Sequence, residues 1–167
     1  MEEIADLLKT IAHAPVTKRA ITNHDVLNEA YAYAKPSSFS RGMRIDLNGL
    51  VILLISGTAS IDEQGRSIHI GDFRAQMRRT LDNITGLLAT EGATWHDMVR
   101  TTCYLRDIER DYAVFNEERT AFMTEQGLDP LPASTGIQAT LCRPELLVEI
   151  EAIAMFRAES DVADSES

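Results

Sequence analysis

The sequence has little of several features that would indicate particular protein classes. It contains two cysteines, Cys103 and Cys142, whose separation matches neither a CxxC pair nor a Cys/His metal site. We therefore expect reduced, structural thiols and no bound metal. No apolar run approaches the roughly 20 residues that span a membrane, and the start lacks the pattern of a secretory leader. These absences predict a cytoplasmic protein with no membrane partner.

Positive charge is also scarce. The chain has 16 lysines and arginines against 26 aspartates and glutamates, which gives a formal net charge of −10. Binding of nucleic-acid phosphates needs clustered basic side chains, so we expect no nucleic-acid partner. An anionic small molecule would have to be held by a local basic site. The length and apolar content fit one domain with a sizeable core.

Hydrophobic periodicity predicts five strands and two long helices. The strands are expected at residues 39–47, 50–55, 98–105, 133–141 and 146–156. The helices are expected from Asp72 to about Thr90, and from Asp107 or Glu109 to Gly127. Asn48-Gly49 indicates a hairpin turn between the first two strands. The order β-β-α-β-α-β-β predicts an α+β fold, with one sheet and two long helices on one face.

The two ends of the chain are expected to lie outside this domain. Residues 3–12 have apolar side chains at helical spacing, which predicts a short helix within an N-terminal extension of residues 1–36. Residues 159–167 are rich in serine and acidic residues, a composition that predicts a disordered tail. The domain itself is expected to span residues 37–158.

The predicted strand at residues 50–55 is apolar on both faces. A strand that helices cover on one side only should alternate between apolar and polar residues, so we expect its second face to be buried as well. In a single domain of this size, the natural cover is another subunit.

The last predicted strand carries two carboxylates among apolar residues. Because side chains alternate along a strand, Glu149 and Glu151 point to the same face as Leu147 and Ile153. A carboxylate with such neighbours is solvated, paired, or protonated with a raised pKa, and a raised pKa suits acid/base chemistry. Two interpretations stay open here: a solvated row of polar side chains, or a functional glutamate.

Several short motifs resemble the RidA/YjgF family in order and spacing across residues 39–157. They are Ile55-Ser56-Gly57, Gly71-Asp72 with Gln76, Leu81-Asp82-Asn83-Ile84, Phe115-Asn116-Glu117, Pro132-Ala133 and Val148 to Ala154. The resemblance implies a chorismate-mutase-like fold and a homotrimer with its sheets toward the three-fold axis. It also implies a site in each subunit interface, and no cofactor.

The same resemblance implies hydrolysis of reactive enamines and imines to keto acids and ammonia. In typical members an arginine after Pro-Ala binds the substrate carboxylate, and the first glutamate of Glu-x-Glu handles the proton. That glutamate is Glu149 here, but the arginine position is Ser134, the usual cysteine is Gly136, and the family's aromatic residue is Phe39. A serine hydroxyl cannot replace a bidentate guanidinium contact.

A second resemblance concerns the C-terminal half of chorismatases, which hydrolyse the enolpyruvyl ether of chorismate. It lies in residues 39–42, 55–61 and 142–149. It implies that Glu149 protonates the substrate, that Arg143 or Arg41 holds a carboxylate, and that the position of Cys142 influences the product. Enamines and enol ethers both have an electron-rich double bond beside a carboxylate, so one acid can activate either.

The candidate site therefore consists of one catalytic residue, Glu149, and a set of substrate-binding residues. That set is Arg143, Arg41, Ser134, Cys142, Gly57, Phe39 and Asn116, with Arg44 as a further anchor. Structural alternatives stay open, since Arg143-Pro144 is also a plausible turn and Asn116 a plausible loop-bonding amide. The main hypothesis is a trimeric hydrolase acting on a small anionic metabolite. The alternative is a non-catalytic trimer that binds a small molecule or a partner.

Overall fold

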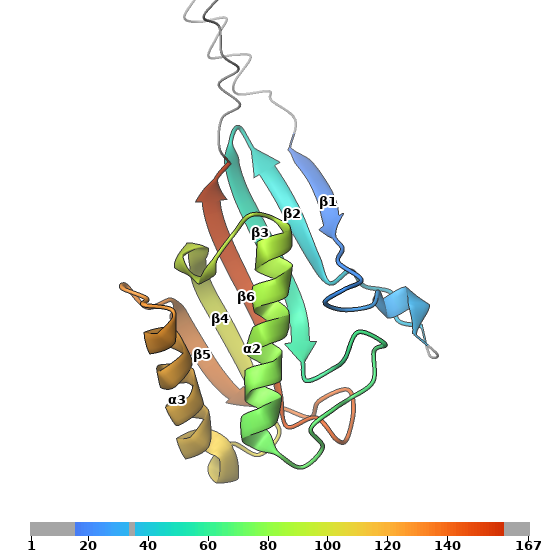
Figure 1. The fold of residues 1–167 in the computed structure, drawn as a ribbon, viewed down its shortest axis with the longest axis vertical. Helices are drawn as coiled ribbons and strands as arrows, with labels where there is room; N and C mark the ends of the chain where they lie inside the picture. Colours follow the sequence, from blue (N-terminus) through green and yellow to red (C-terminus); the bar gives the residue numbers. More distant parts are fainter. Residues whose placement is uncertain (1–15, 34–35, 159–167) are drawn as a thin grey trace, which may run out of the picture.

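The computed structural model describes residues 16–33 and 36–158. Its elements are β1 (Thr17–Ile21), the 3-10 turn η1 (Ala30–Ala32), β2 (Gly42–Leu47), β3 (Leu50–Ala59), α2 (Phe73–Thr90), the 3-10 turn η2 (Trp95–Asp97), β4 (Met98–Leu105), α3 (Ile108–Glu125), β5 (Ala133–Gln138) and β6 (Val148–Arg157). Within these residues, six strands form one sheet in the order β1-β2-β3-β6-β4-β5. Helices α2 and α3 lie side by side on one face of this sheet (Figure 1). The predicted α+β fold is confirmed.

The centre of the sheet is the antiparallel pair β3–β6. Its register is regular from Leu50 to Ile55, and one extra residue on β3 then forms a bulge before Thr58. On the other side of β6 lies β4, and β4 pairs in parallel with the edge strand β5. This parallel pair requires a crossover, which α3 provides.

The hydrophobic core lies between the sheet and the two helices. Strand β3 contributes Val51, Leu53 and Ile55, each 3% exposed or less, and α2 contributes a stripe that includes Leu81 and Ile84. The stripe recurs every three to four residues, as an amphipathic helix requires. The two predicted helix starts are confirmed, because the carboxylates of Asp72 and Asp107 cap α2 and α3.

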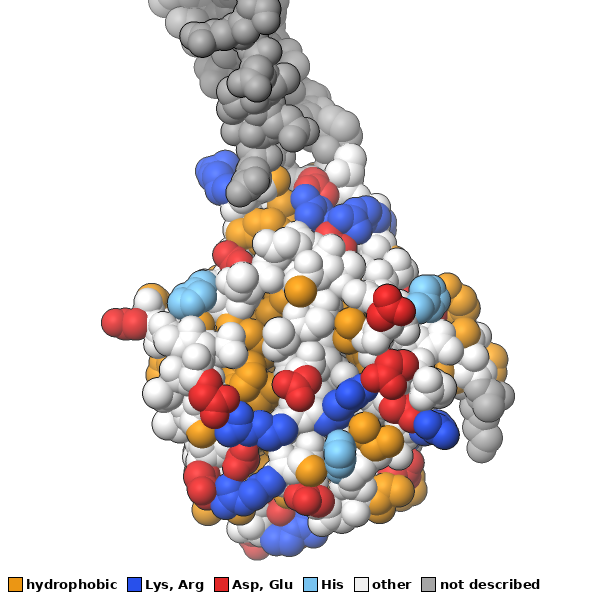
Figure 2. Space-filling model, viewed as in Figure 1, with side chains coloured by type: hydrophobic (Ala, Val, Ile, Leu, Met, Phe, Trp, Pro, Cys, Tyr) orange, Lys and Arg blue, Asp and Glu red, His pale blue; other side chains and the backbone are white. Residues whose placement is uncertain are grey.

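Ion pairs join the outer surfaces of the two helices. Arg74 and Arg78 of α2 each bond to Glu118 of α3, with N···O distances of 2.5 and 2.6 Å. Figure 2 shows that acidic and basic side chains are interspersed over this side of the molecule. None of the helices that the structure describes is long and apolar enough to cross a membrane.

Several strands differ from the sequence-based expectation. Strand β2 begins at Gly42 rather than at residue 39, and β3 continues to Ala59 rather than ending at residue 55. Residues 17–21 were placed in an extension, but they form β1 and pair with β2 from Thr17↔Asp46 to Ile21↔Gly42. Only Ile21 of this edge strand is buried, so no apolar alternation marks it in the sequence. The edge strand β5 ends at Gln138 rather than at residue 141, and all its residues are exposed. The predicted N-terminal helix and acidic tail lie outside the described residues.

The second face of the sheet differs from the first in its exposure. Leu53 and Ala154 on the helix side are fully buried, whereas Leu54 and Met155 on the opposite side are both 39% exposed. In the described part of the chain no helix covers this second face. The apolar character of strand β3 on both faces therefore remains unexplained by the single chain, and its cover by another subunit stays a prediction.

Candidate active site

A cavity of about 630 Å³ opens where the end of β3 meets the start of β6. Its walls come from Tyr33, residues 37–41, the end of β3, the turn at residues 61–66 and the loop at residues 142–146. Six of the predicted site residues line it: Glu149, Arg143, Arg41, Cys142, Gly57 and Phe39. The fold thus brings together residues from both ends of the domain.

Glu149 lies half-buried on β6, between the buried residues Val148 and Ile150. Within residues 16–33 and 36–158, no donor forms a hydrogen bond to its carboxylate. Burial, and to a smaller extent the charge of the nearby Glu151, raises the pKa of Glu149 above its ordinary value. Of the possibilities that the sequence left open, this arrangement corresponds to a carboxyl group whose protonated form is favoured.

Gly57 provides the space that the Glu149 carboxylate occupies. A Cβ atom built on Gly57 would overlap the Oε1 atom of Glu149. Gly57 is one of the residues at the bulge of β3, so the bulge and the missing side chain act together. The close approach is a physical reason for glycine at this position.

Three arginines line the same cavity, and one of them, Arg66, is paired with Asp62. The guanidinium of Arg41, a residue only 2% exposed, donates two hydrogen bonds to the carbonyl oxygen of Asn28, at 2.9 and 2.7 Å. Arg143 donates from Nη1 to the Gly65 carbonyl oxygen at 2.8 Å and to the Ser67 hydroxyl at 3.2 Å. Within the described residues, neither Arg41 nor Arg143 forms an ion pair with a carboxylate.

Tyr33 connects the two arginines, and sequence reasoning missed it. The Cζ atoms of Arg41 and Arg143 lie 5.0 and 5.2 Å from the centre of its ring, and Arg41 also lies 5.3 Å from the ring of Phe39. These are cation–π distances. Tyr33 lies in a segment without periodicity, so no sequence pattern distinguished it from the exposed Tyr31.

The loop that carries Cys142 and Arg143 is fixed by buried polar contacts. The Arg106 guanidinium donates to three of its backbone carbonyl groups, those of Leu141, Arg143 and Leu146. The buried side chain of Gln76 donates to the Glu145 carbonyl oxygen and accepts a hydrogen bond from the Leu147 N–H. Both thiols are free, and Cys142 is exposed rather than a buried structural residue.

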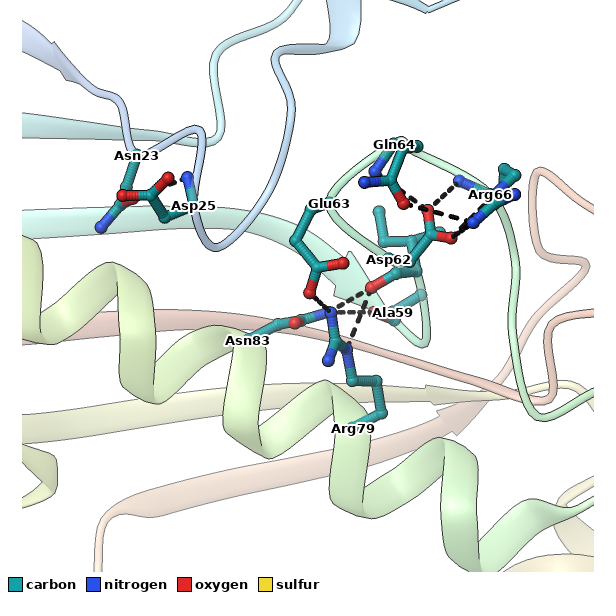
Figure 3. Close-up of polar contacts among 10 residues, drawn as sticks. Asn23, Asp25, Ala59, Asp62, Glu63, Gln64, Arg66, Arg79 and Asn83 are labelled. Atoms are coloured by element: carbon teal, nitrogen blue, oxygen red, sulfur yellow. Dashed lines mark hydrogen bonds and ion pairs between the residues drawn. The ribbon is translucent and has the colours of Figure 1, made fainter.

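The opposite wall, residues 61–66, is held by a second polar network (Figure 3). Asn83 of α2 donates to the carbonyl oxygens of Ala59 and Ile61, both at 3.0 Å. Asp62 accepts hydrogen bonds from the backbone N–H groups of Gln64 and Arg66, which closes the turn. These contacts make the wall part of the scaffold.

Two predicted site residues do not reach this cavity within one chain. Ser134 and Asn116 lie at the edge formed by β5 and α3, beside a smaller cavity of about 210 Å³ that Ser134 lines. Arg119 joins them, because its guanidinium donates to Asn116 Oδ1 at 2.6 Å and to Ser134 Oγ at 3.2 Å. Arg119 was assigned no role from the sequence.

Arg44 is not placed to anchor a substrate. It forms ion pairs with Asp46 at 2.8 Å and with Glu91 at 3.2 Å, on the helix side of β2. Its charge is already paired inside the chain, so the prediction of Arg44 as a further carboxylate anchor is wrong. Within the described ranges, no group of three or more His, Cys, Asp or Glu side chains is placed to hold a metal ion.

Comparison with known proteins identifies the family. A profile described as Endoribonuclease L-PSP matches residues 30–156. The chain belongs to this family, RidA/YjgF. The 2-iminobutanoate/2-iminopropanoate deaminase of Salmonella typhimurium is 31% identical over 113 residues, 68% of this chain and 84% of that protein. The 3-aminoacrylate deaminase RutC of Acinetobacter baylyi is 31% identical over 103 residues, 62% of this chain and 78% of that protein.

Solved structures agree with this assignment. The YjgF gene product from E. coli superposes with a TM-score of 0.65 and 28% identity, over 83% of this chain and 99% of that one. Membership of RidA/YjgF confirms the resemblance inferred from short motifs. The motif residues Gly57, Gln76 and Asn83 each have a visible role here, as space for Glu149 and as supports for the two cavity walls.

We predict that Gly57→Ala displaces the Glu149 carboxylate toward solvent, because the new methyl group would overlap Oε1. The pKa of Glu149 should then fall toward its ordinary value, since burial is the main cause of its rise. Carbon-detected NMR titration of the side-chain carboxyl group measures this. Gly136→Ala is the matched control, because a Cβ there meets no atom within 4 Å. An unchanged Glu149 pKa in Gly57→Ala would contradict the proposed packing.

Proposed function

We propose that this RidA/YjgF member is a hydrolase that acts on a small anionic enamine, imine or enol ether, with Glu149 as the acid/base. The observation that carries the proposal is a half-buried carboxyl group with a raised pKa, in a cavity that also holds two arginines without ion pairs. Two relatives named as deaminases support this reaction class. The substrate itself is left to experiment.

The chemistry follows from the electron-rich double bond of such substrates. In its protonated form, Glu149 would give its proton to the terminal carbon of the C=C bond of an enamine or enol ether, or to the nitrogen of an imine, which leaves an iminium or oxocarbenium centre. The resulting carboxylate would then take a proton from the water that adds to this centre. Collapse of the adduct expels ammonia or an alcohol and leaves a keto acid. A raised carboxyl pKa suits the first step, because more of the acid form is present near neutral pH.

The alternative function is a non-catalytic binding protein on the same scaffold, and its main support is serine at position 134. One discriminating feature is a second positive group near Glu149. Arg41 and Arg143 both line the cavity, which favours an anionic ligand over a neutral one. Binding of nucleic acid is disfavoured by the net charge of −10 and by the interspersed charges in Figure 2.

We further propose a homotrimer, with a site in each subunit interface as the family resemblance implies. The exposed apolar side chains Leu54 and Met155 on the uncovered sheet face support burial by other subunits. In such an assembly the edge with Asn116 and Ser134 of one subunit can complete the Glu149 cavity of the next. Arg119 would then supply a guanidinium at the position where typical members have an arginine.

Glu149→Gln should abolish turnover, because an amide cannot donate and recover the proton. The assay is ammonia and pyruvate release from 2-aminoacrylate generated in situ and, separately, pyruvate release from chorismate. Glu151→Gln is the matched control and should stay active. The Glu151→Gln change removes a like charge that helps to raise the pKa of Glu149, so this pKa should fall. The active acid form of Glu149 is then lost at a lower pH than in the parent protein, and activity should decline at that lower pH. Full activity of Glu149→Gln would overturn the mechanism.

Leu54→Asp should break the assembly, because it places a charge on the apolar sheet face. Light scattering after gel filtration should give three times the chain mass of 18.5 kDa for the parent protein and a single chain mass for the variant. Ile70→Asp, at a position that is 70% exposed before α2, should leave the trimer intact. A parent protein that elutes as a monomer at all concentrations would refute the assembly.

Arg119→Gln should raise KM for the anionic substrate roughly tenfold or more, because one charge-assisted hydrogen bond to a carboxylate is lost. The matched control is Arg110→Gln on the same helix, where the side chain pairs with Asp111 instead. Steady-state kinetics with 2-aminoacrylate measures the effect. Equal KM values for the two variants would show that the β5–α3 edge takes no part in substrate binding.

A further inference from the structure

We infer that the Glu149 cavity selects a substrate with two carboxylates, one for Arg41 and one for Arg143, and that Tyr33 is the residue that positions both guanidinium groups. This inference rests on the proposed function, because it concerns the same cavity. It specifies the substrate class more narrowly than an anionic enamine, imine or enol ether does.

The first argument is that two positive charges in one cavity have no carboxylate partner in the described residues, a state that these arginines share with Arg100, Arg106, Arg119 and Arg157 outside the cavity. Seven others in the described residues form ion pairs with carboxylates: Arg19, Arg44, Arg66, Arg74, Arg78, Arg79 and Arg110. Arg41 and Arg143 instead donate to backbone carbonyl oxygens and a hydroxyl. These acceptors fix the guanidinium groups in place but do not neutralise their charge.

The second argument is electrostatic. Burial lowers the pKa of Arg41, the carboxylate of Glu29 partly offsets this, and the charge of Arg143 lowers it further. The pKa of Glu145 is lowered mainly by a hydrogen bond from Ser67, and the nearby charge of Arg143 lowers it further. Neither glutamate forms an ion pair with these arginines in the described structure. Two positive charges that repel one another beside a cavity are best neutralised by two negative charges on a ligand.

The third argument is the position of Tyr33. Its ring lies within cation–π distance of both guanidinium groups, at 5.0 and 5.2 Å. A Cβ atom built on Gly65 would overlap this ring, so the ring lies directly against the wall at residues 61–66. The aromatic ring stabilises each positive charge but does not neutralise it, so both guanidinium groups remain able to bind an anion. Tyr33 is therefore a positioning residue.

The size of the cavity fits the same conclusion. A volume of about 630 Å³ lies within the range of sites for drug-sized ligands, far above what a three-carbon imino acid fills. The rings of Tyr33 and Phe39 add flat apolar surface to its wall. A substrate with one carboxylate would leave one of the guanidinium groups without a counter-charge, so the second carboxylate contributes selectivity.

The test compares two keto acids of equal chain length that differ by one carboxylate, 2-oxoglutarate and 2-oxopentanoate. Both are titrated calorimetrically into the Glu149→Gln protein, so binding is measured without turnover. We expect 2-oxoglutarate to bind about tenfold tighter or more, as one added charge-assisted contact implies. Equal affinities, or no measurable binding of 2-oxoglutarate at millimolar concentration, would overturn the inference.

Variants assign the preference to its residues. Arg143→Gln in the same background should reduce the preference to below about threefold, since only one guanidinium remains. Tyr33→Leu should do the same, whereas Tyr33→Phe should retain the preference because the ring supplies the contact. Tyr31→Leu, at a position that is 64% exposed, is the matched control and should bind both acids as the parent does. A full preference in Tyr33→Leu would refute the positioning role.

This experiment separates the inference from the proposed function. If the parent protein turns over neither 2-aminoacrylate nor chorismate but binds 2-oxoglutarate more tightly than 2-oxopentanoate, the inference about two carboxylates stands and the proposed hydrolase is overturned. Turnover of 2-aminoacrylate with equal binding of the two keto acids would do the reverse. The two failures therefore give different results.

Discussion

The antiparallel pairing of β3 with β6 is the constraint on which the rest of the structure depends. Alternation along β6 buries Val148 and Ile150 under the helices and forces Glu149 to the other side of the sheet. One extra residue on β3 then breaks the register beside it, and Gly57 leaves room for the carboxylate. A shift of register by a single residue would exchange the two faces, so the core and the site are specified together.

The pairing of charged side chains differs between the outer surface and the cavity. The chain is strongly acidic, and most arginines outside the cavity are neutralised by carboxylates, as in the Arg74 and Arg78 pairs with Glu118. Inside the cavity Arg66 is paired with Asp62, but Glu149 lacks a described donor and Arg41 and Arg143 lack described carboxylate partners. Groups that could satisfy one another are thus held apart by the backbone contacts of Arg41 and Arg143. Charged groups without partners of opposite charge are typical of a binding site whose ligand supplies the missing contacts.

The sequence predicted elements whose burial is periodic and missed those whose burial is not. Helices α2 and α3 and strands β3, β4 and β6 each have a buried face, so their patterns were readable. The edge strand β1 buries only Ile21, and backbone pairing with β2 defines it. Glu149 stood out as a carboxylate in an apolar strand. Tyr33 did not, because its role depends on a contact with Arg143, which is far away in the chain. Arg44 misled because strand periodicity does not indicate that its charge is paired with Asp46 and Glu91.

Serine at position 134 does not by itself argue against chemistry in this family member. A substrate carboxylate needs a guanidinium within reach, and its position in the chain is immaterial. In our proposal the anchors are Arg41 and Arg143, held by backbone carbonyl groups, while Arg119 takes the place beside Ser134. Anchors on the cavity wall, in addition to Arg119 at the strand edge, change which substrates fit but leave the proton transfer at Glu149 intact. Specificity can therefore diverge on this scaffold without loss of the acid/base step.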